Sequence, residues 1–228
     1  MARASLQLLA LLLCAAAPAS CAPWRPTPPC AAPAGIARPA VAECMCSREA
    51  ARRGDVAVRE VGLPAAATLV VSAFSAPQWD VVIGYGVTSL LDFFAGDNAR
   101  KAQLPGARTA PISFRQRALP NGTVTQWTSG MLVSTAAFPA PASIPAPVDP
   151  LALEAVGHRL VAVRQFDTPG RFPTQAEFAA ACAGISADSL PSGYAINTTS
   201  EWTPTYLLYS AESSPVYESE CWVEVTAI

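Results

Sequence analysis

The sequence predicts an α+β fold in which two helices pack on a distorted β-barrel or sheet made of two similar halves. Short runs of β-branched and aromatic residues, bounded by Gly, Pro and Asn, recur along the chain and are typical of strands. Two windows, around Val87 and around Phe178, change instead to the helical period. Each window has two expected strands on either side, so the order strand, strand, helix, strand, strand occurs twice.

The composition excludes several classes of function. The chain has 228 residues, a formal net charge of -2 and one histidine, His158. A single imidazole excludes a histidine-rich zinc site and a His-Glu-x-x-His hydrolase. The slightly acidic balance, with a pI of about 5.4, argues against a nucleic-acid partner, which would favour a basic surface. The length fits one domain of roughly 200 residues and leaves the oligomeric state open.

The N-terminal residues 1–19 match a secretory signal peptide. Arg3 gives a positive start, residues 6–17 are almost entirely apolar, and Ala17-Pro18-Ala19 fits a small-x-small cleavage site. The apolar run is shorter than the roughly 20 residues that cross a bilayer, so we expect no transmembrane span. A lipoprotein anchor at Cys21 is the alternative, for which Pro18 is a poor residue. We therefore predict a protein that is secreted or resides in the secretory pathway.

The cysteines that remain after this signal peptide are even in number, as in disulfide-bonded secreted proteins. They are Cys21, Cys30, Cys44, Cys46, Cys182 and Cys221. Several pairings are possible, and the sequence does not choose among them. Two sequons, Asn121-Gly122-Thr123 and Asn197-Thr198-Thr199, predict a glycoprotein and agree with the secretory route.

Residues 20–55 are rich in Pro and Ala and predict an extended N-terminal arm, pinned by cysteines rather than by a core. The folded domain is expected over residues 56–228. Its first half should hold strands at 56–61 and 68–74. A helix follows that Asp80 caps and Gly96 ends. The apolar face of this helix carries Ile83, Val87, Leu90, Leu91 and Phe94.

An Asn-Gly pair then predicts a hairpin between a strand at 112–119 and a return strand at 124–137. Five prolines in residues 138–150 indicate a surface connection to the second half. In that half, strands at 151–156 and 160–166 are expected to form a hairpin at Gly157-His158. A capping box from Thr174 to Glu177 opens the second helix. Strands at 202–209 and 220–225 complete the domain, and Met131 is expected in the core.

Five short motifs in this order resemble the SOUL/haem-binding protein family. They are Phe93-Phe94-Ala95-Gly96-Asp97-Asn98, Thr109-Ala110-Pro111, Pro145-Ala146-Pro147 with Asp149, Val161-Ala162-Val163-Arg164-Gln165-Phe166, and Glu220-Cys221-Trp222-Val223. The resemblance covers about residues 56–225, and Glu43-Cys44 is similar to secreted plant-type members. Between Ser186 and Ser219 the chain departs from the family pattern.

The resemblance implies a distorted barrel of two similar halves that binds haem or another tetrapyrrole without catalysis. The ligand would lie in an apolar groove beside the first helix, against Val87, Leu91 and Phe94. Arg100 and Arg108 would reach the carboxylates of a porphyrin. The alternative is that these apolar residues are simply core and the basic residues a solvated loop.

Axial ligation of a haem iron is not expected. Haem iron takes His, Cys, Met or Tyr, and His158 is predicted to lie at a solvated turn. Disulfide-bonded cysteines supply no thiolate. We therefore expect tetrapyrrole binding without a strong histidine ligand, and no metal site.

Enzymatic readings have little support. The chain has no Gly-x-Ser-x-Gly elbow and no glycine-rich phosphate loop, so a hydrolase is less favoured. Glu218 and Glu220 share a strand face near the C-terminus and are expected to be solvated. The main alternative function is a secreted, disulfide-stabilised glycoprotein that binds a protein or glycan through Trp202, Tyr206 and Tyr209.

Overall fold

The computed structural model describes residues 36, 47–61, 68–74, 78–104, 108–118, 124–134, 137–138, 140–200, 204–209 and 215–228. The predicted signal peptide lies outside these residues, as does most of the predicted arm. Four of the six candidate disulfide cysteines, Cys21, Cys30, Cys44 and Cys46, also lie outside them, together with Asn121 and Trp202.

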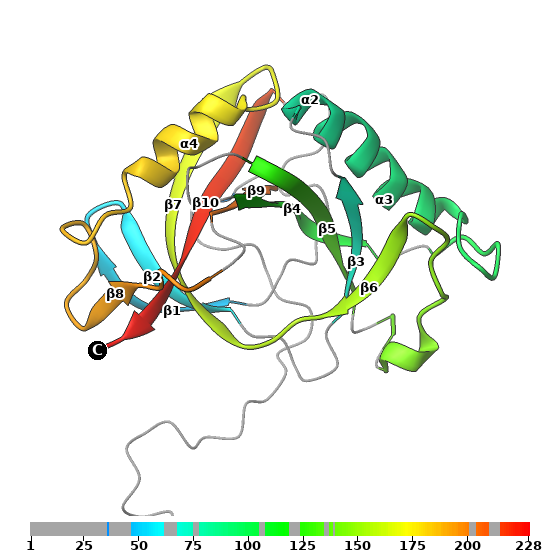
Figure 1. Cartoon of the computed structure of the whole chain (residues 1–228), viewed down its shortest axis with the longest axis horizontal. Coiled ribbons are helices and arrows are strands. Elements are labelled where there is room, and N and C mark those ends of the chain that lie inside the picture. The colour runs from blue at the N-terminus through cyan, green and yellow to red at the C-terminus, as the bar shows by residue number, and fades with distance from the viewer. Residues whose placement is uncertain are drawn as a thin grey trace, which may run out of the picture.

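The described strands form one strongly bent, antiparallel sheet of ten strands, with the helices along its outer face (Figure 1). The strands are β1 (Ser47–Arg53), β2 (Val56–Val61), β3 (Thr68–Phe74), β4 (Arg108–Ala118), β5 (Val124–Val133), β6 (Leu151–Ala155), β7 (Arg159–Pro169), β8 (Tyr194–Ile196), β9 (Thr205–Leu208) and β10 (Val216–Ala227). Their order is β1-β2-β7-β10-β9-β4-β5-β3-β6, and β8 pairs with β10. The predicted α+β class is confirmed, with an open sheet.

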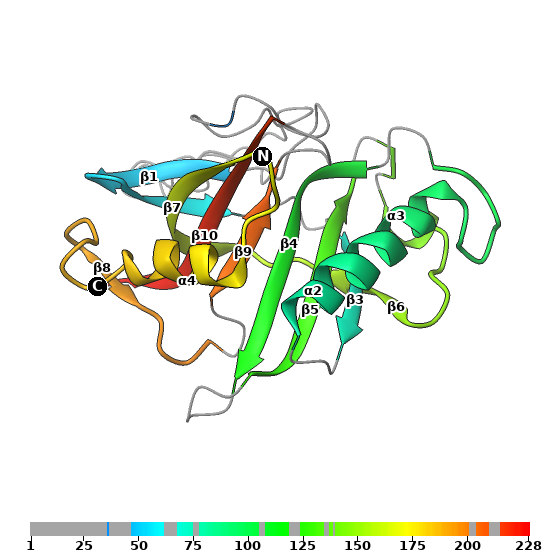
Figure 2. The same ribbon diagram turned by 90° about the horizontal axis from the view of Figure 1, so that it is seen from above.

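The first helical segment comprises α2 (Trp79–Val81), the π-helical turn η2 (Val82–Gly86) and α3 (Val87–Ala95). It ends at Gly96, whose φ of 122° favours glycine, as the sequence predicts. The predicted cap at Asp80 is wrong, because the N-cap position is Gln78 and Asp80 lies inside the first turn. From above, the segment runs along β3, β4 and β5 (Figure 2).

The second helix, α4 (Gln175–Ala183), begins with the predicted capping box. The hydroxyl of Thr174 accepts a hydrogen bond from the backbone N–H of Glu177, whose carboxylate accepts one from the backbone N–H of Thr174. Near its other end, Cys182 forms a disulfide with Cys221 of β10. This pair confirms the predicted disulfide bonding for two of the six cysteines, and it joins α4 to β10.

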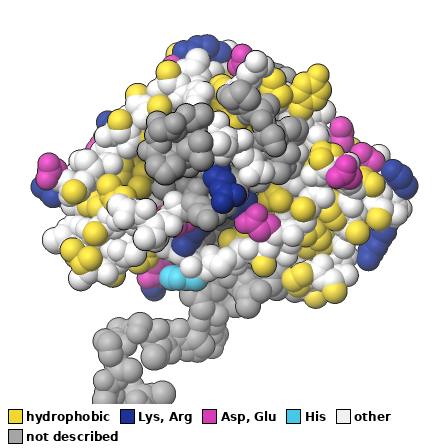
Figure 3. All heavy atoms as spheres, viewed as in Figure 1, with side chains coloured by type: hydrophobic (Ala, Val, Ile, Leu, Met, Phe, Trp, Pro, Cys, Tyr) yellow, Lys and Arg dark blue, Asp and Glu magenta, His cyan; other side chains and the backbone are white. Residues whose placement is uncertain are grey.

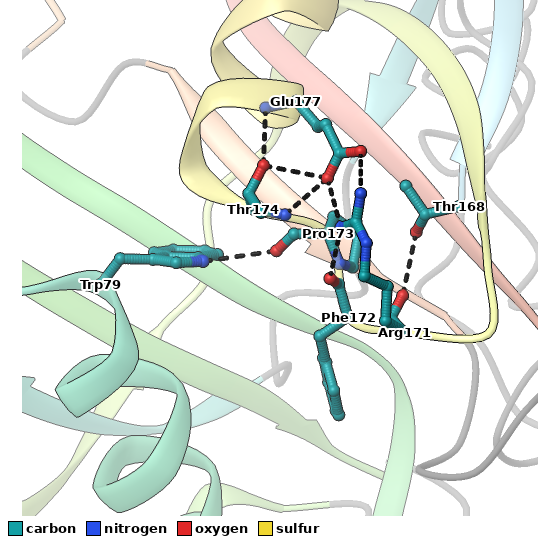
Figure 4. A network of polar contacts seen from close by, with 7 residues as sticks. All are labelled: Trp79, Thr168, Arg171, Phe172, Pro173, Thr174 and Glu177. Atoms are coloured by element: carbon teal, nitrogen blue, oxygen red, sulfur yellow. Dashed lines mark hydrogen bonds and ion pairs between the residues drawn. The ribbon is translucent and has the colours of Figure 1, made fainter.

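Aromatic rings fill the space between the helices and the outer face. The Trp79 ring lies 5.2 Å from Phe114, 5.1 Å from Trp127 and 5.6 Å from Phe178, measured between ring centroids. Its indole Nε1 donates a 3.3 Å hydrogen bond to the carbonyl oxygen of Pro173, just before α4 (Figure 4). Trp79 therefore links the two helical segments.

Two predictions about the strands are wrong. β6 and β7 follow each other but do not pair: β6 pairs with β3, whereas β7 pairs with β2 and β10. His158 therefore lies in a crossover between the two sides of the sheet, not in a hairpin. In addition, β1 falls within the expected arm and pairs with β2, so the sheet begins at Ser47.

An η3 turn (Pro141–Ser143) lies in the proline-rich connection before β6. Within the described chain, no helix combines the length and the apolar character needed to cross a membrane.

Candidate functional site

The face of the sheet opposite the helices, here called the inner face, has an apolar floor. Side chains from the central strands form it, with Val161, Val163, Leu207 and Trp222 among them. Ile36 is buried in the same cluster, which corrects the expectation that the N-terminal arm makes no core contact. The inner face is thus the second hydrophobic surface of the protein, and charged side chains lie within it.

A glutamate carboxylate lies at the centre of this floor. Glu220 has a solvent-exposed fraction of 0% and accepts hydrogen bonds from four side chains. Oε1 accepts from Arg59 Nη1 and from Gln165 Nε2, both at 2.8 Å. Oε2 accepts from the Tyr209 hydroxyl at 3.0 Å and from Trp222 Nε1 at 2.7 Å. We call these five residues the Glu220 cluster.

The strand pattern explains why the cluster forms on one face. Side chains alternate along a strand, so Glu218, Glu220 and Trp222 point to the inner face while Cys221 and Val223 pack under α4. Because β10 pairs with β7 on one side and β9 on the other, its inner-face side chains have neighbours from both strands. Glu218 and Glu220 are both buried, so the prediction that they are solvated is wrong.

The electrostatics of the cluster are balanced. An isolated carboxylate is costly to bury, and the Arg59 guanidinium, itself buried, supplies the compensating charge. The three neutral donors satisfy the remaining lone pairs. All four donors are engaged by Glu220, so the cluster forms a polar, charge-balanced centre within the apolar floor.

A second ion pair bridges the inner face. Arg115 of β4 donates from Nη1 and Nη2 to the two carboxylate oxygens of Glu154 in β6, each at 2.7 Å. Hydrogen bonding from Arg115 lowers the pKa of the Glu154 carboxyl, against the opposing effect of its burial, and the charges of Arg115 and Arg159 lower it further. The Arg115 side chain is 6% exposed and the Glu154 side chain 42%.

A pocket of about 140 Å³ opens beside this pair, at the crossover between β6 and β7. Leu69, Glu154, His158 and Arg159 are among the residues that line it. Arg159 also donates a 3.2 Å hydrogen bond to Glu224. Acidic and basic side chains gather in the hollow at the middle of this view of the molecule, above the histidine (Figure 3). Charged groups therefore border the described opening of the inner face.

A further pocket of about 370 Å³ lies on the outer face between α4 and the sheet. Its lining includes Gln116, Ala179, Cys182, Tyr206 and Val223. Burial raises the pKa of the Tyr206 phenol to about 12. The ring of Tyr206 stacks on that of Phe178, 4.7 Å between centroids, so its aromatic faces already serve the core.

The groove predicted beside the first helix has a different character. Phe94 is 7% exposed and packs with Leu90 and Phe93 on the sheet, whereas Val87 and Leu91 are half-buried at the margins of the core. Neither described pocket is lined by these residues.

The basic residues predicted for this groove follow the helix. Arg100 is exposed in a loop that Asn98 holds, and the Asn98 amide donates to the carbonyl oxygens of Phe93 and Ala102. Arg108 begins β4, and its side chain lies outside the described atoms. The structure does not gather the five predicted residues around one described cavity.

Other predicted site residues fall as follows. Tyr206 and Tyr209 are buried on opposite faces of the sheet, so neither ring can form the surface proposed for a macromolecular partner. Met131 lies in the core, as predicted. Asn197 is half-buried, and its Oδ1 accepts hydrogen bonds from the backbone and hydroxyl of Thr199.

The residue types that can ligate a haem iron lie at different places in the fold. Met131 is packed in the core, Cys182 and Cys221 are joined to each other, and His158 is exposed in the crossover, where it lines the pocket beside Glu154. No cluster of three or more His, Cys, Asp or Glu within the described ranges forms a metal-binding group.

Comparisons with known proteins assign no family. No family model matches the chain, and no curated protein matches it. Its structure is similar to the C-terminal domain of EcmrR, with 10% identity over 76% of this chain and 98% of that one, at a TM-score of 0.48. A hydrolase from Listeria innocua gives 10% identity over 78% and 94% of the two chains, also at 0.48.

SAV2435 bound to tetraphenylphosphonium gives 12% identity over 74% of this chain and 93% of that chain, at a TM-score of 0.38. Likenesses this weak carry no argument about function. Membership of the SOUL/haem-binding family stays a prediction from the motifs.

Proposed function

We propose that this protein binds a largely apolar, carboxylate-bearing small molecule on the inner face of its sheet, without catalysis. Haem or another tetrapyrrole is the ligand class that the sequence resemblance favours. The observation that carries the proposal is the Glu220 cluster: a fully buried carboxylate with a guanidinium and two aromatic donors, set on an apolar floor. Hydrophobic side chains of similar size often stabilise such a position as well as a buried ion pair does, so stability alone does not account for the cluster, and we propose that it serves recognition.

The inner face supports this proposal better than the groove beside α3. Arg59, Arg115 and Arg159 all lie on that face, and guanidinium groups pair with carboxylates in a planar, two-bond geometry. Trp222 and Leu207 form the apolar floor beside these groups; both are buried, so a ligand would reach them only after the groups that cover them move. The apolar side chains of α3 are likewise partly used in packing.

The size of the described opening sets a condition on binding. Sites for drug-sized ligands usually measure about 300–1,000 Å³, and the pocket beside Glu154 measures about 140 Å³. A tetrapyrrole therefore requires side chains at the mouth of the inner face to move. Glu154, half-exposed on an edge strand, is placed to do so.

Titration with protoporphyrin and with haemin, followed by absorption in the Soret region, tests the proposal. We expect saturable binding of both, with similar affinity, because no axial ligand contributes. Arg115→Gln should weaken binding at least tenfold, whereas Arg100→Gln, at an exposed position beside α3, should leave it unchanged. The opposite pattern would place the ligand beside the helix, and no saturation by either compound would refute tetrapyrrole binding.

We also infer that the fold consists of two similar halves, β2-β3-α3-β4-β5 and β6-β7-α4-β9-β10. The strand order supports this inference. From β2 inward the order is β2-β7-β10-β9, and from β6 inward it is β6-β3-β5-β4. In each series, the first strand of one half is followed by the second, fourth and third strands of the other half. Such an exchange ties the halves together and creates one inner face between them.

The secretory route and glycosylation are further proposals. The hydrogen bond from the Thr199 hydroxyl to Asn197 Oδ1, at 2.7 Å, and the position of both residues outside a paired strand support modification of this sequon. Expression of the full chain in a eukaryotic secretory host should give secreted protein that loses mass on treatment with a glycan-removing amidase. Asn197→Gln should remove one glycan, and an unmodified wild-type protein would refute the proposal.

A further inference from the structure

We propose that Arg115 is the carboxylate-binding residue of this protein and that Glu154 occupies the position of the ligand carboxylate while no ligand is bound. On binding, the ligand carboxylate would replace Glu154 on Arg115. The inference deepens the proposed function and rests on it only in that the natural ligand carries a carboxylate. It assigns to the ion pair a role as an internal competitor for the site.

The geometry of the pair is that of carboxylate recognition. Two parallel N–H donors of one guanidinium meet the two oxygens of one carboxylate, each at 2.7 Å. This two-bond arrangement is specific for planar oxyanions and is stronger than a single charge contact. A free carboxylate could adopt the same position without any change in Arg115.

The pair also connects strands that are distant along the sheet. Two strands, β5 and β3, separate β4 from β6, a distance of about 14 Å on a flat sheet. Arg115 is in register with Thr128 of β5, while Glu154 is in register with Leu69 of β3. The side chains meet only because the sheet bends, so the pair crosses the inner face instead of following a strand.

Exchange of one carboxylate for another requires a fixed guanidinium and a mobile acid, and the exposure of the two partners fits these roles. Arg115 is fixed in the floor at 6% exposure, whereas Glu154 is 42% exposed on β6, at an edge of the described sheet. Among the ion pairs of the described residues, no other combines a buried base with an exposed acid. Arg59 and Glu220 are both buried, while Arg52 and Glu49 are both exposed.

Glu154 has a place to go when it leaves Arg115. It lines the 140 Å³ pocket together with Arg159. The Nε of Arg159 is buried and has no hydrogen-bond partner among the described residues. Rotation of Glu154 toward this N–H would satisfy a buried donor and keep the carboxylate paired, on a guanidinium that also pairs with Glu224.

Rescue of a truncated variant by a small carboxylate tests the proposal. Glu154→Ala removes the internal carboxylate and should lower the melting temperature. Sodium acetate should then raise the melting temperature of this variant by about 2–4 °C more than sodium chloride of equal ionic strength. The double variant Arg115→Gln/Glu154→Ala should lose this difference. Equal effects of acetate and chloride on Glu154→Ala would overturn the proposal.

Glu49→Ala is the matched control. Glu49 forms the same kind of two-bond pair with Arg52, at 3.0 and 2.7 Å, but both side chains are exposed. Acetate should raise the melting temperature of Glu49→Ala no more than chloride does. If Glu154→Ala does not fold, Glu154→Gln keeps the side-chain volume and is tested with the same expected result.

Protoporphyrin and its dimethyl ester separate this inference from the proposed function. If acetate rescues Glu154→Ala but neither porphyrin binds, Arg115 is a carboxylate site for a different ligand. If protoporphyrin binds and acetate gives no rescue, the exchange is refuted while the proposed function stands. If both hold, Glu154→Gln should strengthen binding of the diacid several-fold and leave that of the ester unchanged.

Discussion

Trp222 and Glu220 lie two residues apart on β10, and the indole Nε1 of Trp222 donates a 2.7 Å hydrogen bond to Glu220 Oε2. The period of the strand points both side chains to the inner face, so β10 itself brings donor and acceptor together. Arg59 and Gln165 reach the same carboxylate from β2 and β7. The cluster thus joins three strands through one side chain.

Removing the charge of Glu220 should therefore be costly. Glu220→Gln keeps the shape of the side chain but leaves Arg59 buried without a compensating charge, so we expect a loss of about 3–5 kcal/mol in the free energy of unfolding. Denaturation by urea measures this loss. Glu60→Gln is the control, because Glu60 pairs with the exposed Arg48 and should cost about 1 kcal/mol or less. Similar losses in both variants would contradict the assignment of Glu220 as the centre of the cluster.

The disulfide between Cys182 and Cys221 should stabilise the folded protein mainly by reducing the conformational entropy of the unfolded chain. It closes a loop with a sequence separation of 39 residues. A loop of this length corresponds to about 4 kcal/mol in the chain-entropy description. The double variant Cys182→Ala/Cys221→Ala should therefore unfold at a lower urea concentration than the wild type. A reducing agent should lower the unfolding midpoint of the wild type as well, and should leave that of the double variant unchanged. A variant as stable as the oxidised wild type would contradict the prediction.

Much of the fold follows from local patterns. The alternation in β2 and β3, the capping box at Thr174 and the exit at Gly96 are properties of a few neighbouring residues, and all were predictable. The pairing of β6 was not, because consecutive strands are adjacent in most sheets and the crossover between β6 and β7 has no local signature.

The candidate site was harder to predict than the fold. A glutamate near a chain terminus is usually solvated, whereas Glu220 is buried among Arg59, Gln165 and Tyr209, which reach it from elsewhere in the chain. A usable signal is the alternation of Glu218, Glu220 and Trp222 opposite Cys221 and Val223, since it places two acids and an indole on one face. Arg115 and Glu154 carry no such signal, because they meet through the bend of the sheet.

A Cβ at Gly184 would collide with the guanidinium of Arg164, which bonds to Asp55 at 2.8 Å. Gly184→Ala should displace this guanidinium, and because it is the end of a flexible side chain in an exposed ion pair, the melting temperature should fall by about 2 °C or less. Gly157→Ala is the control, because a Cβ there meets no atom within 4 Å. Thermal unfolding compares the two variants, and an equal response would show that Arg164 relocates freely.

The phenol of Tyr206 should make stability fall at alkaline pH. In the unfolded chain a tyrosine ionises near pH 10, whereas burial raises the pKa of Tyr206 in the folded protein to about 12. Below about pH 10 both states keep the proton, and this group gives no pH dependence. Between these two pKa values the unfolded state loses the proton and the folded state does not, so unfolding becomes more favourable by about 1.4 kcal/mol per pH unit.

Tyr206→Phe isolates this effect from the other groups that titrate in alkali. The hydroxyl of Tyr206 has no hydrogen-bond partner among the described residues, so its removal keeps the stacking on Phe178 and breaks no bond. Urea unfolding of wild type and variant at several values above pH 9 should show a shallower decline in Tyr206→Phe. Tyr85, 70% exposed on η2, provides the control, since Tyr85→Phe should follow the wild type. Parallel declines in wild type and Tyr206→Phe would show that the phenol ionises as readily in the folded protein as in the unfolded chain.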